Sequence, residues 1–302
     1  MCASKARQYK GATISLATSS VDPILFTKRI WSACAVPAML YAGEALMIRA
    51  NDLKTCEMMQ SRIAKRVLSV EVSSANMAAQ RMAGMIPIRA KYYNRALRFL
   101  HKMQTSDENS LFHKSYKTCK DLGEKSLYWK EISKIVKKCK WDGNPKTIDR
   151  CVDEYIVGFI NRSLDKTAKT CFSVPRATLA NLGSPIPTLD TSTASKTANA
   201  FMLLNAGLGN RTARPGRSRD KECVLCGGEL DEVHLLFTCP VLEPVRVKVG
   251  IRDFQNRRQG LPVETTFTKY WNLWDMSREA KNARVKAAMC MRQAYLRVLG
   301  TK

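Results

Sequence analysis

The sequence of 302 residues has no long uninterrupted apolar stretch. Its most apolar run, residues 33–48, is broken by Pro37 and Glu44 and is shorter than the ~20 residues that a bilayer demands. The first residues lack a compact apolar core with a cleavage site, which argues against a secretory signal. These absences lead us to expect an intracellular protein with no membrane partner.

Motifs of common enzyme classes are also missing. No Asp-Asp pair occurs, whereas polymerases and nucleases that use two metals need clustered carboxylates to hold Mg²⁺. There is no Gly-x-x-x-x-Gly-Lys phosphate loop, no His-Glu-x-x-His and no Gly-x-Ser-x-Gly. We therefore expect no catalytic residue in this chain alone and no small-molecule substrate.

Acidic residues are scarce relative to basic ones: 50 Lys and Arg face 26 Asp and Glu, a formal net charge of +24 at pH 7. A surplus this large usually accompanies an anionic partner, because self-repulsion opposes compaction of the chain. Nucleic acid is the first candidate and an acidic membrane surface the second. The 11 cysteines, an odd and mostly scattered set, do not resemble a paired extracellular framework, so we expect a reducing compartment.

Apolar residues recur mainly at helical spacing, so the sequence predicts a mostly α fold. It consists of a helical bundle, a small metal-binding module and C-terminal helices. Arg62, Lys65 and Arg66 are expected on the exposed face of one helix, and Arg95 and Arg98 on that of another. Between them and the module, a Ser-, Thr- and Pro-rich stretch predicts a linker, followed by a helix over residues 193–208.

One motif has the spacing of a metal site: Cys223-x2-Cys226-x7-His234-x4-Cys239. Three thiolates and one imidazole in this order can close a tetrahedron around one Zn²⁺. The protein fills all four positions and leaves none for water or substrate, so we expect a structural zinc. The alternative is three buried free cysteines beside a chance histidine.

Basic residues flank this motif, but none lies within residues 222–245. We expect the module to hold these flanking basic residues in fixed relation, where they contact nucleic-acid phosphates. The alternative for the upstream segment is a solvated loop. The expected contacts are Arg211, Arg214, Arg217, Arg219 and Lys221 upstream, and Arg246 and Lys248 downstream.

Cys223-Val-Leu-Cys-Gly-Gly, followed by the segment from Val233 to Arg246, resembles the C-terminal zinc-binding segment of non-LTR retrotransposon reverse transcriptases. Upstream, Met39-Leu-Tyr-Ala-Gly-Glu resembles the Leu-Tyr-Gly-x-Glu stretch that follows the polymerase palm in that family. Gln60-Ser-Arg-Ile-Ala-Lys-Arg-Val-Leu resembles a helix of the family's thumb. The resemblance covers most of the chain in order.

The resemblance implies a chain that begins just after the palm, with thumb, linker and zinc knuckle. The thumb-like helices would then hold nucleic acid through Arg62, Lys65, Arg66, Arg95 and Arg98. The family's catalytic Tyr/Phe-x-Asp-Asp has no counterpart, so polymerase activity is not carried over. The expected parts are a thumb-like region (1–110), a helical linker domain (111–170), a Ser/Thr/Pro-rich linker and helix (171–210), the basic loop and CCHC zinc module (211–258), and a C-terminal helical tail (259–302).

Three functions remain open at this point. The first is a nuclear, zinc-containing module that binds RNA, DNA or a hybrid of the two. The second is the tail of an active RNA-directed DNA polymerase whose palm is absent from this chain. The third is a zinc-stabilised protein–protein adaptor, which would bind no nucleic acid even at ~0.05 M salt, where electrostatic binding is strongest.

Overall fold

The computed structural model describes most of the chain, and the described part is helical. It contains no β-strand, only an isolated antiparallel bridge between Glu222 and Glu229. The expectation of a mostly α fold is therefore confirmed. The described residues are 13, 23–70, 72–166, 174, 176–184, 198–200, 202, 222–258, 260–271 and 276–300.

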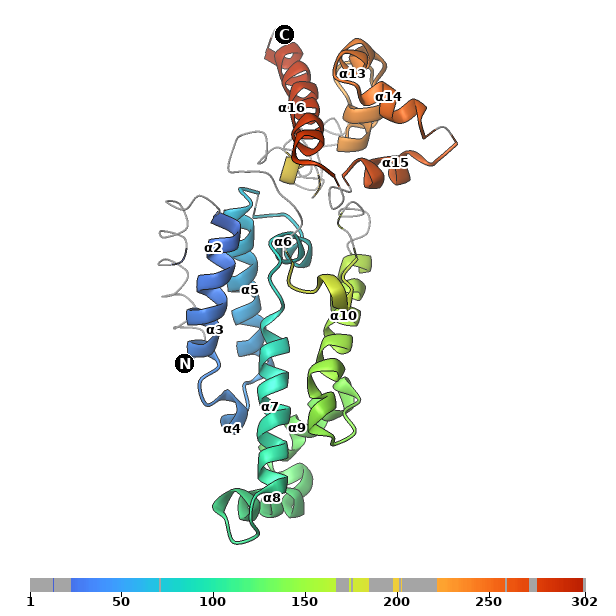
Figure 1. The fold of residues 1–302 in the computed structure, drawn as a ribbon. Coiled ribbons are helices and arrows are strands. Elements are labelled where there is room, and N and C mark those ends of the chain that lie inside the picture. The colour runs from blue at the N-terminus through green and yellow to red at the C-terminus, as the bar shows by residue number, and fades with distance from the viewer. Residues whose placement is uncertain are drawn as a thin grey trace.

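A first group of helices forms an elongated body with α7 at its centre (Figure 1). Helix α7 lies against α4, α5, α8, α9 and α10, so the stretches predicted as thumb-like region and linker domain share one core. The elements are α2 (Pro23–Ile30), η1 (Trp31–Ala35), α3 (Val36–Met39), α4 (Gly43–Leu46), α5 (Ala50–Val67), α6 (Asn76–Met82), α7 (Ile88–Thr105), α8 (Leu111–Leu122), η2 (Gly123–Lys125), α9 (Leu127–Cys139), η3 (Pro145–Thr147) and α10 (Ile148–Lys166).

The sequence predicts that Pro37 kinks or ends the first helix. The helix does not end at Pro37: it continues through η1 and α3, and the turn before Pro37 is widened to π-type spacing. Proline lacks the N–H that would donate to the preceding turn, and a wider turn accommodates the missing bond. Trp31, at the start of this turn, is buried, and its Nε1 donates to Gln60 Oε1 at 3.0 Å.

Two buried glutamines join α5 to α6 and to the segment that follows α6. Gln60 Nε2 donates to the Ile86 carbonyl at 2.9 Å, and Gln80 Nε2 donates to Ser61 Oγ at 2.6 Å. A buried amide without partners would destabilise the fold, so these hydrogen bonds help to fix how the two helices pack. Gln60, which carries part of the family resemblance, therefore has a structural role here.

Two basic side chains of the first body, one of them expected on an exposed helix face, are largely enclosed. Lys65 is buried and its Nζ donates to the Val72 carbonyl at 2.6 Å. Its burial and the neighbouring Arg62 both lower the pKa of the Lys65 ammonium. Arg89 Nε donates to Glu57 Oε1 at 2.6 Å, and its guanidinium lies 3.8 Å from the centroid of the Phe159 ring. The prediction that Lys65 lies on the exposed face is wrong, because α5 packs on α6 through more of its surface than the apolar stripe indicates.

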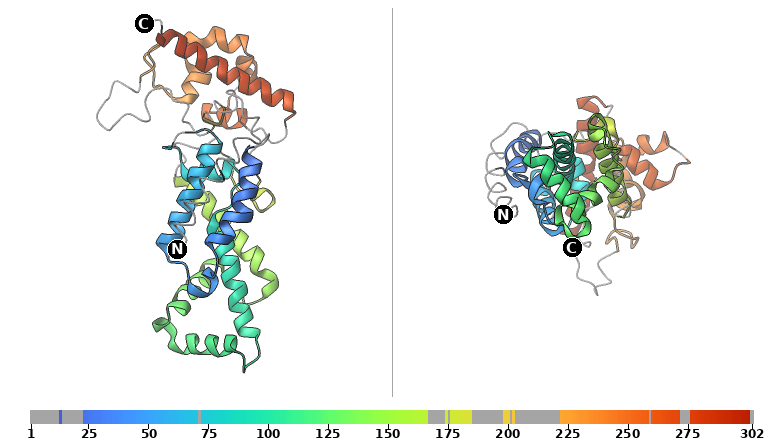
Figure 2. Two further views of the ribbon diagram at one scale, coloured as in Figure 1. Left: turned by 90° about the vertical axis from the view of Figure 1, so that its left-hand side faces the viewer. Right: turned by 90° about the horizontal axis from the view of Figure 1, so that it is seen from below.

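A second group of helices lies beyond the end of the first body at which α6 is found (Figures 1 and 2). Helix α16 packs against η6, η7 and α13, so residues predicted as a C-terminal tail share a core with the Cys–His motif. The elements are η6 (His234–Thr238), η7 (Pro240–Leu242), α13 (Glu243–Lys248), α14 (Ile251–Asn256), α15 (Val263–Tyr270) and α16 (Arg278–Gly300).

The linker between the two groups is described only in part. Residues 176–184, which include η4 (Leu179–Asn181), return to the first body, where Arg81 Nη1 donates to the Ser184 carbonyl at 2.7 Å. The helix predicted over residues 193–208 lies for the most part outside the described residues. Among the helices that are described, none is both long and apolar enough to cross a bilayer.

Replacing Glu57 by alanine tests the enclosed ion pair. Only 13% of the Glu57 side chain and 19% of the Arg89 side chain are exposed, so truncation leaves a poorly hydrated cation. We expect Glu57→Ala to lower the free energy of unfolding by about 2–3 kcal/mol, measured by urea denaturation and circular dichroism. Glu131→Ala is the control, because it breaks the more exposed ion pair between Glu131 and Lys134. It should change the free energy of unfolding by less than about 0.5 kcal/mol. Equal effects of the two substitutions would contradict this account.

Candidate metal centre

Four side chains of the second group converge on one point. The thiols of Cys223, Cys226 and Cys239 and a ring nitrogen of His234 all lie within 4.8 Å of one another. Cys239 Sγ is 3.9 Å from each of the other two sulfurs, and Cys226 Sγ is 3.2 Å from His234 Nε2. The cluster can therefore hold a metal ion. We call these four residues the Cys–His cluster.

The first two ligands lie on a tight turn. The Gly227 amide donates to the Cys223 carbonyl at 2.7 Å, and the Cys223 amide donates to the Gly228 carbonyl at 2.6 Å. Gly227 has a φ of +75°, in the left-handed region that glycine adopts without strain. A Cβ on Gly228 would lie 3.1 Å from His234 Cε1, so glycine also lets the imidazole approach the turn.

The other two ligands bracket a single helical turn. The Asp231 carboxylate accepts from the His234 amide at 2.6 Å, as a helix-capping residue does. The Cys239 amide donates to the His234 carbonyl at 2.8 Å, which closes the wider turn of η6. His234 Nδ1 is 3.1 Å from Thr238 Oγ1, and this contact orients the ring so that Nε2 faces Cys226.

Apolar side chains next to the cluster residues pack into the core and hold the cluster in place. Leu235, Leu236 and Phe237, which lie between the last two residues of the cluster, are all buried. The Phe237 ring meets those of Phe267 and Tyr270 edge to face, at centroid distances of 6.1 and 5.7 Å. The turn that carries two ligands is therefore anchored on α15, a helix that the motif itself does not include.

The protein environment shifts the pKa values of the cluster residues in different directions. Burial raises the pKa of the Cys239 thiol to about 11, whereas a hydrogen bond from the Gly228 backbone lowers the pKa of Cys226. Burial lowers the pKa of His234, which favours the neutral imidazole that metals bind. A bound cation would stabilise the Cys239 thiolate that burial disfavours, so metal binding should release a proton.

Arg246 does not have the place that the sequence predicts. Its side chain is only 2% exposed, and its guanidinium donates to the Cys239 carbonyl and, through Nε, to Glu243 Oε2 at 2.8 Å. A phosphate cannot reach a group so enclosed, so we correct its assignment from phosphate contact to support of the cluster. Lys248, two residues further along α13, is exposed as expected.

Several residues that support the cluster lie outside the four predicted ligands. Asp231 and Thr238 hold the histidine turn, and the spacing Asp-x-x-His is a capping signal that could have identified the first. Tyr295 of α16 is buried, and burial together with nearby Cys223 raises the pKa of its hydroxyl. No sequence signal links Tyr295 to the cluster, because the contact depends on how α16 packs.

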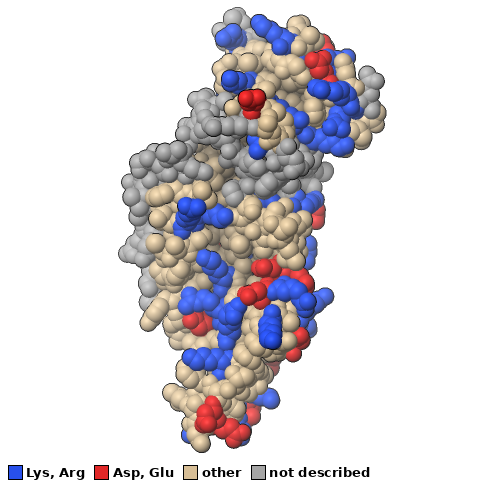
Figure 3. All heavy atoms as spheres, in the orientation of Figure 1, with Lys and Arg blue, Asp and Glu red and all other residues tan. Residues whose placement is uncertain are grey.

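The remaining predicted basic contacts are not gathered at one place. Arg62 and Arg66 are exposed on α5, whereas α7 carries Arg95, 2.9 Å from Glu44, and Arg98, 2.8 Å from Asp149. On the face drawn in Figure 3, basic side chains are spread over both groups of helices with fewer acidic ones between them. Outside the described residues lie Arg211, Arg214, Arg217, Arg219 and Lys221.

Comparison with models of known protein families, with curated proteins and with solved structures gives no match for this chain. The geometry of the Cys–His cluster is therefore the observation on which functional inference depends. Every cysteine in the described ranges is a free thiol, so none of the cluster's sulfurs is used in a disulfide.

Gly228→Ala should weaken metal binding about tenfold or more, because the added methyl group displaces the His234 ring. The readout is a Co²⁺ titration followed by visible absorption. Gly143→Ala is the matched control: it introduces backbone strain at a φ of +91°, has no heavy atom within 4 Å and lies far along the chain from the cluster. Unchanged affinity in Gly228→Ala would show that the ring needs no such clearance.

Arg246→Gln should lower metal affinity by about 10- to 100-fold, as loss of a residue that supports a ligand commonly does. Lys248→Gln, on the same helix but exposed, should leave metal affinity unchanged. Competition with a chromophoric chelator measures both. If the two variants retain metal equally well, Arg246 has no role at the cluster.

Proposed function

We propose that the Cys–His cluster binds one structural Zn²⁺ and that the chain is a zinc-stabilised module that binds nucleic acid. The single observation that carries the zinc proposal is the convergence of four ligand atoms within 4.8 Å. The nucleic-acid proposal is supported by the net charge of +24 and by the basic residues that flank the cluster in the sequence.

The cluster fits zinc in distance and in ligand type. In a tetrahedron with metal–sulfur distances of about 2.3 Å, sulfurs lie about 3.8 Å apart. Cys239 Sγ is 3.9 Å from each of the other two sulfurs, close to that separation. Thiolates and imidazole are the ligands that structural zinc sites use, and four of them leave no open position for a substrate. We therefore propose that the metal stabilises the fold and takes no part in catalysis.

Charge balance gives the enclosed arginine a role in this proposal. Zinc with three thiolates and one neutral imidazole carries one net negative charge. The guanidinium of Arg246 donates to the backbone of Cys239, and such a cation offsets that charge in a poorly hydrated environment. Among the described residues, we propose that the exposed side chains of Lys248, Arg62 and Arg66 contact phosphate.

The relation to non-LTR retrotransposon reverse transcriptases stays a prediction of the sequence, and so does a nuclear location. We propose the chain as a template-handling portion of such a protein, without its polymerase active site. The second candidate is the protein–protein adaptor. It is favoured by the ion pairs that occupy Arg95 and Arg98, since paired arginines offer less charge to phosphate.

Removing the metal should unfold the second group of helices and leave the first intact, because structural zinc supplies much of the stability of small modules. Chelation followed by hydrogen exchange and mass spectrometry should show protection lost in α13 and α16 and kept in α7 and α10. Protection that stays unchanged in every helix would instead support the alternative of three buried free cysteines.

Nucleic-acid binding should weaken steeply with salt, because each phosphate contact releases counterions. Reversing Arg214 and Arg217 to Glu should lower affinity similarly for unrelated sequences, measured by fluorescence anisotropy. The matched control reverses Lys114 and Lys117 on α8, at the end of the molecule far from the Cys–His cluster (Figure 1). If the Arg214/Arg217 variant bound nucleic acid as tightly as the wild type, the upstream segment would have no role in binding.

A further inference from the structure

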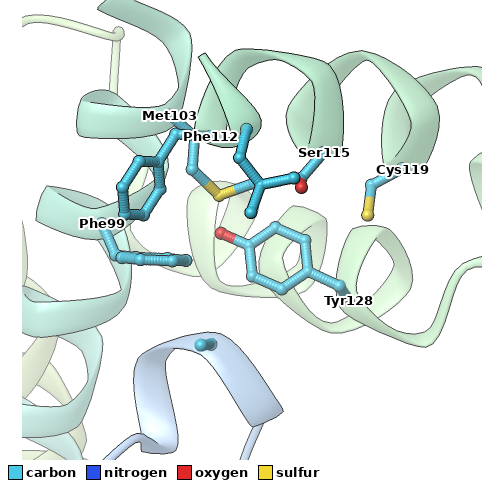
Figure 4. A pocket seen from close by; sticks show the side chains of 8 residues that line it. Phe99, Met103, Phe112, Ser115, Cys119 and Tyr128 are labelled. Atoms are coloured by element: carbon cyan, nitrogen blue, oxygen red, sulfur yellow. The ribbon is translucent and has the colours of Figure 1, made fainter. Parts of the chain in front are cut away.

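A pocket of about 260 Å³ opens between α4, α7, α8 and α9, at the end of the first body remote from the Cys–His cluster (Figures 1 and 4). Protein interiors are normally packed without voids of this size. Helix α8 has no buried residue, and its face that carries Phe112, Ser115 and Cys119 borders the pocket. An engineered apolar cavity of about 150 Å³ accepts benzene, so this one is large enough for a ring with a substituent.

The lining is apolar and largely aromatic. Phe99 and Met103 of α7 form one side, Phe112 another, and Tyr128 of α9 a third. The Phe99 ring meets those of Phe112 and Tyr128 nearly at right angles, with centroids 6.0 and 6.4 Å apart. Rings set in this way offer both faces and edges to a further ring. No charged residue lines the pocket, so a charged group inside it would lack compensation.

One polar atom in the pocket has no partner. The Tyr128 hydroxyl is buried and makes no hydrogen bond. Figure 4 shows it turned inward, to the side on which Phe99 lies. Burial, with a smaller effect of Cys119, raises the pKa of Tyr128, so the hydroxyl keeps its proton and can donate at neutral pH. A donor left unpaired in an apolar site destabilises the protein, and a bound acceptor would relieve that cost.

We propose that this pocket binds a small uncharged aromatic compound that presents one hydrogen-bond acceptor to the Tyr128 hydroxyl. The size of the pocket allows one ring, its lining disfavours charge, and the unpaired hydroxyl of Tyr128 favours an acceptor on the ligand. The pocket lies on elements separate from the Cys–His cluster, so this inference does not depend on the function proposed above.

The test uses the full chain and two fluorinated probes that differ by one acceptor. They are 4-fluoroacetophenone, which carries a carbonyl oxygen, and 1-ethyl-4-fluorobenzene, which does not; ¹⁹F NMR follows both. We expect saturable binding of the ketone with a Kd on the order of 1 mM, as its few atoms allow. Tyr128→Phe should weaken ketone binding about two- to tenfold and leave hydrocarbon binding unchanged.

A second pair of variants tests the location. Ser115→Phe fills the pocket and should abolish binding of both probes, whereas Thr118→Phe adds the same ring at an exposed α8 position outside the lining and should not. No saturable binding by the wild type up to about 10 mM ketone, roughly tenfold above the expected Kd, would overturn the proposal. An equal loss of both probes in Tyr128→Phe would also overturn it, because the hydroxyl would then not act as the donor.

Discussion

Three thiols and an imidazole within 4.8 Å of one another constrain the whole C-terminal group of helices. Three elements meet at this point. The Cys223–Gly228 turn and η6 position ligand atoms, and α13 positions the supporting guanidinium of Arg246. The apolar side chains between the last two ligands then carry this geometry outward, since Phe237 packs on α15 and η6 packs on α16. The motif from Cys223 to Cys239 thus organises a core that extends to Tyr295 of α16.

Burial separates two sets of basic residues in the described part of the chain. Lys65 and Arg246 are enclosed and donate to backbone carbonyls, so their charges serve the fold. Arg62, Arg66 and Lys248 are exposed, and they keep the charge that an anionic partner would meet. Net charge therefore overstates how many cations are accessible to phosphate, and burial identifies which ones remain.

Much of the fold could be predicted from periodicity, because α5, α7, α9 and α10 bury long apolar stripes. The Cys–His cluster was predictable because its ligands are close in sequence. What failed depends on distant contacts: Arg246 looks like any basic helix residue until Cys239 and Glu243 enclose it. Tyr128 gave no signal in the sequence, because its unpaired hydroxyl results from how α7, α8 and α9 meet.

The most direct test of the central claim is X-ray absorption at the zinc edge of the protein as purified. Our account predicts one zinc per chain, with three sulfur ligands at about 2.3 Å and one nitrogen at about 2.0 Å. It also predicts that His234→Ala removes the nitrogen while the three sulfurs remain. A protein without bound metal, or a first shell made mainly of oxygen and nitrogen, would contradict it.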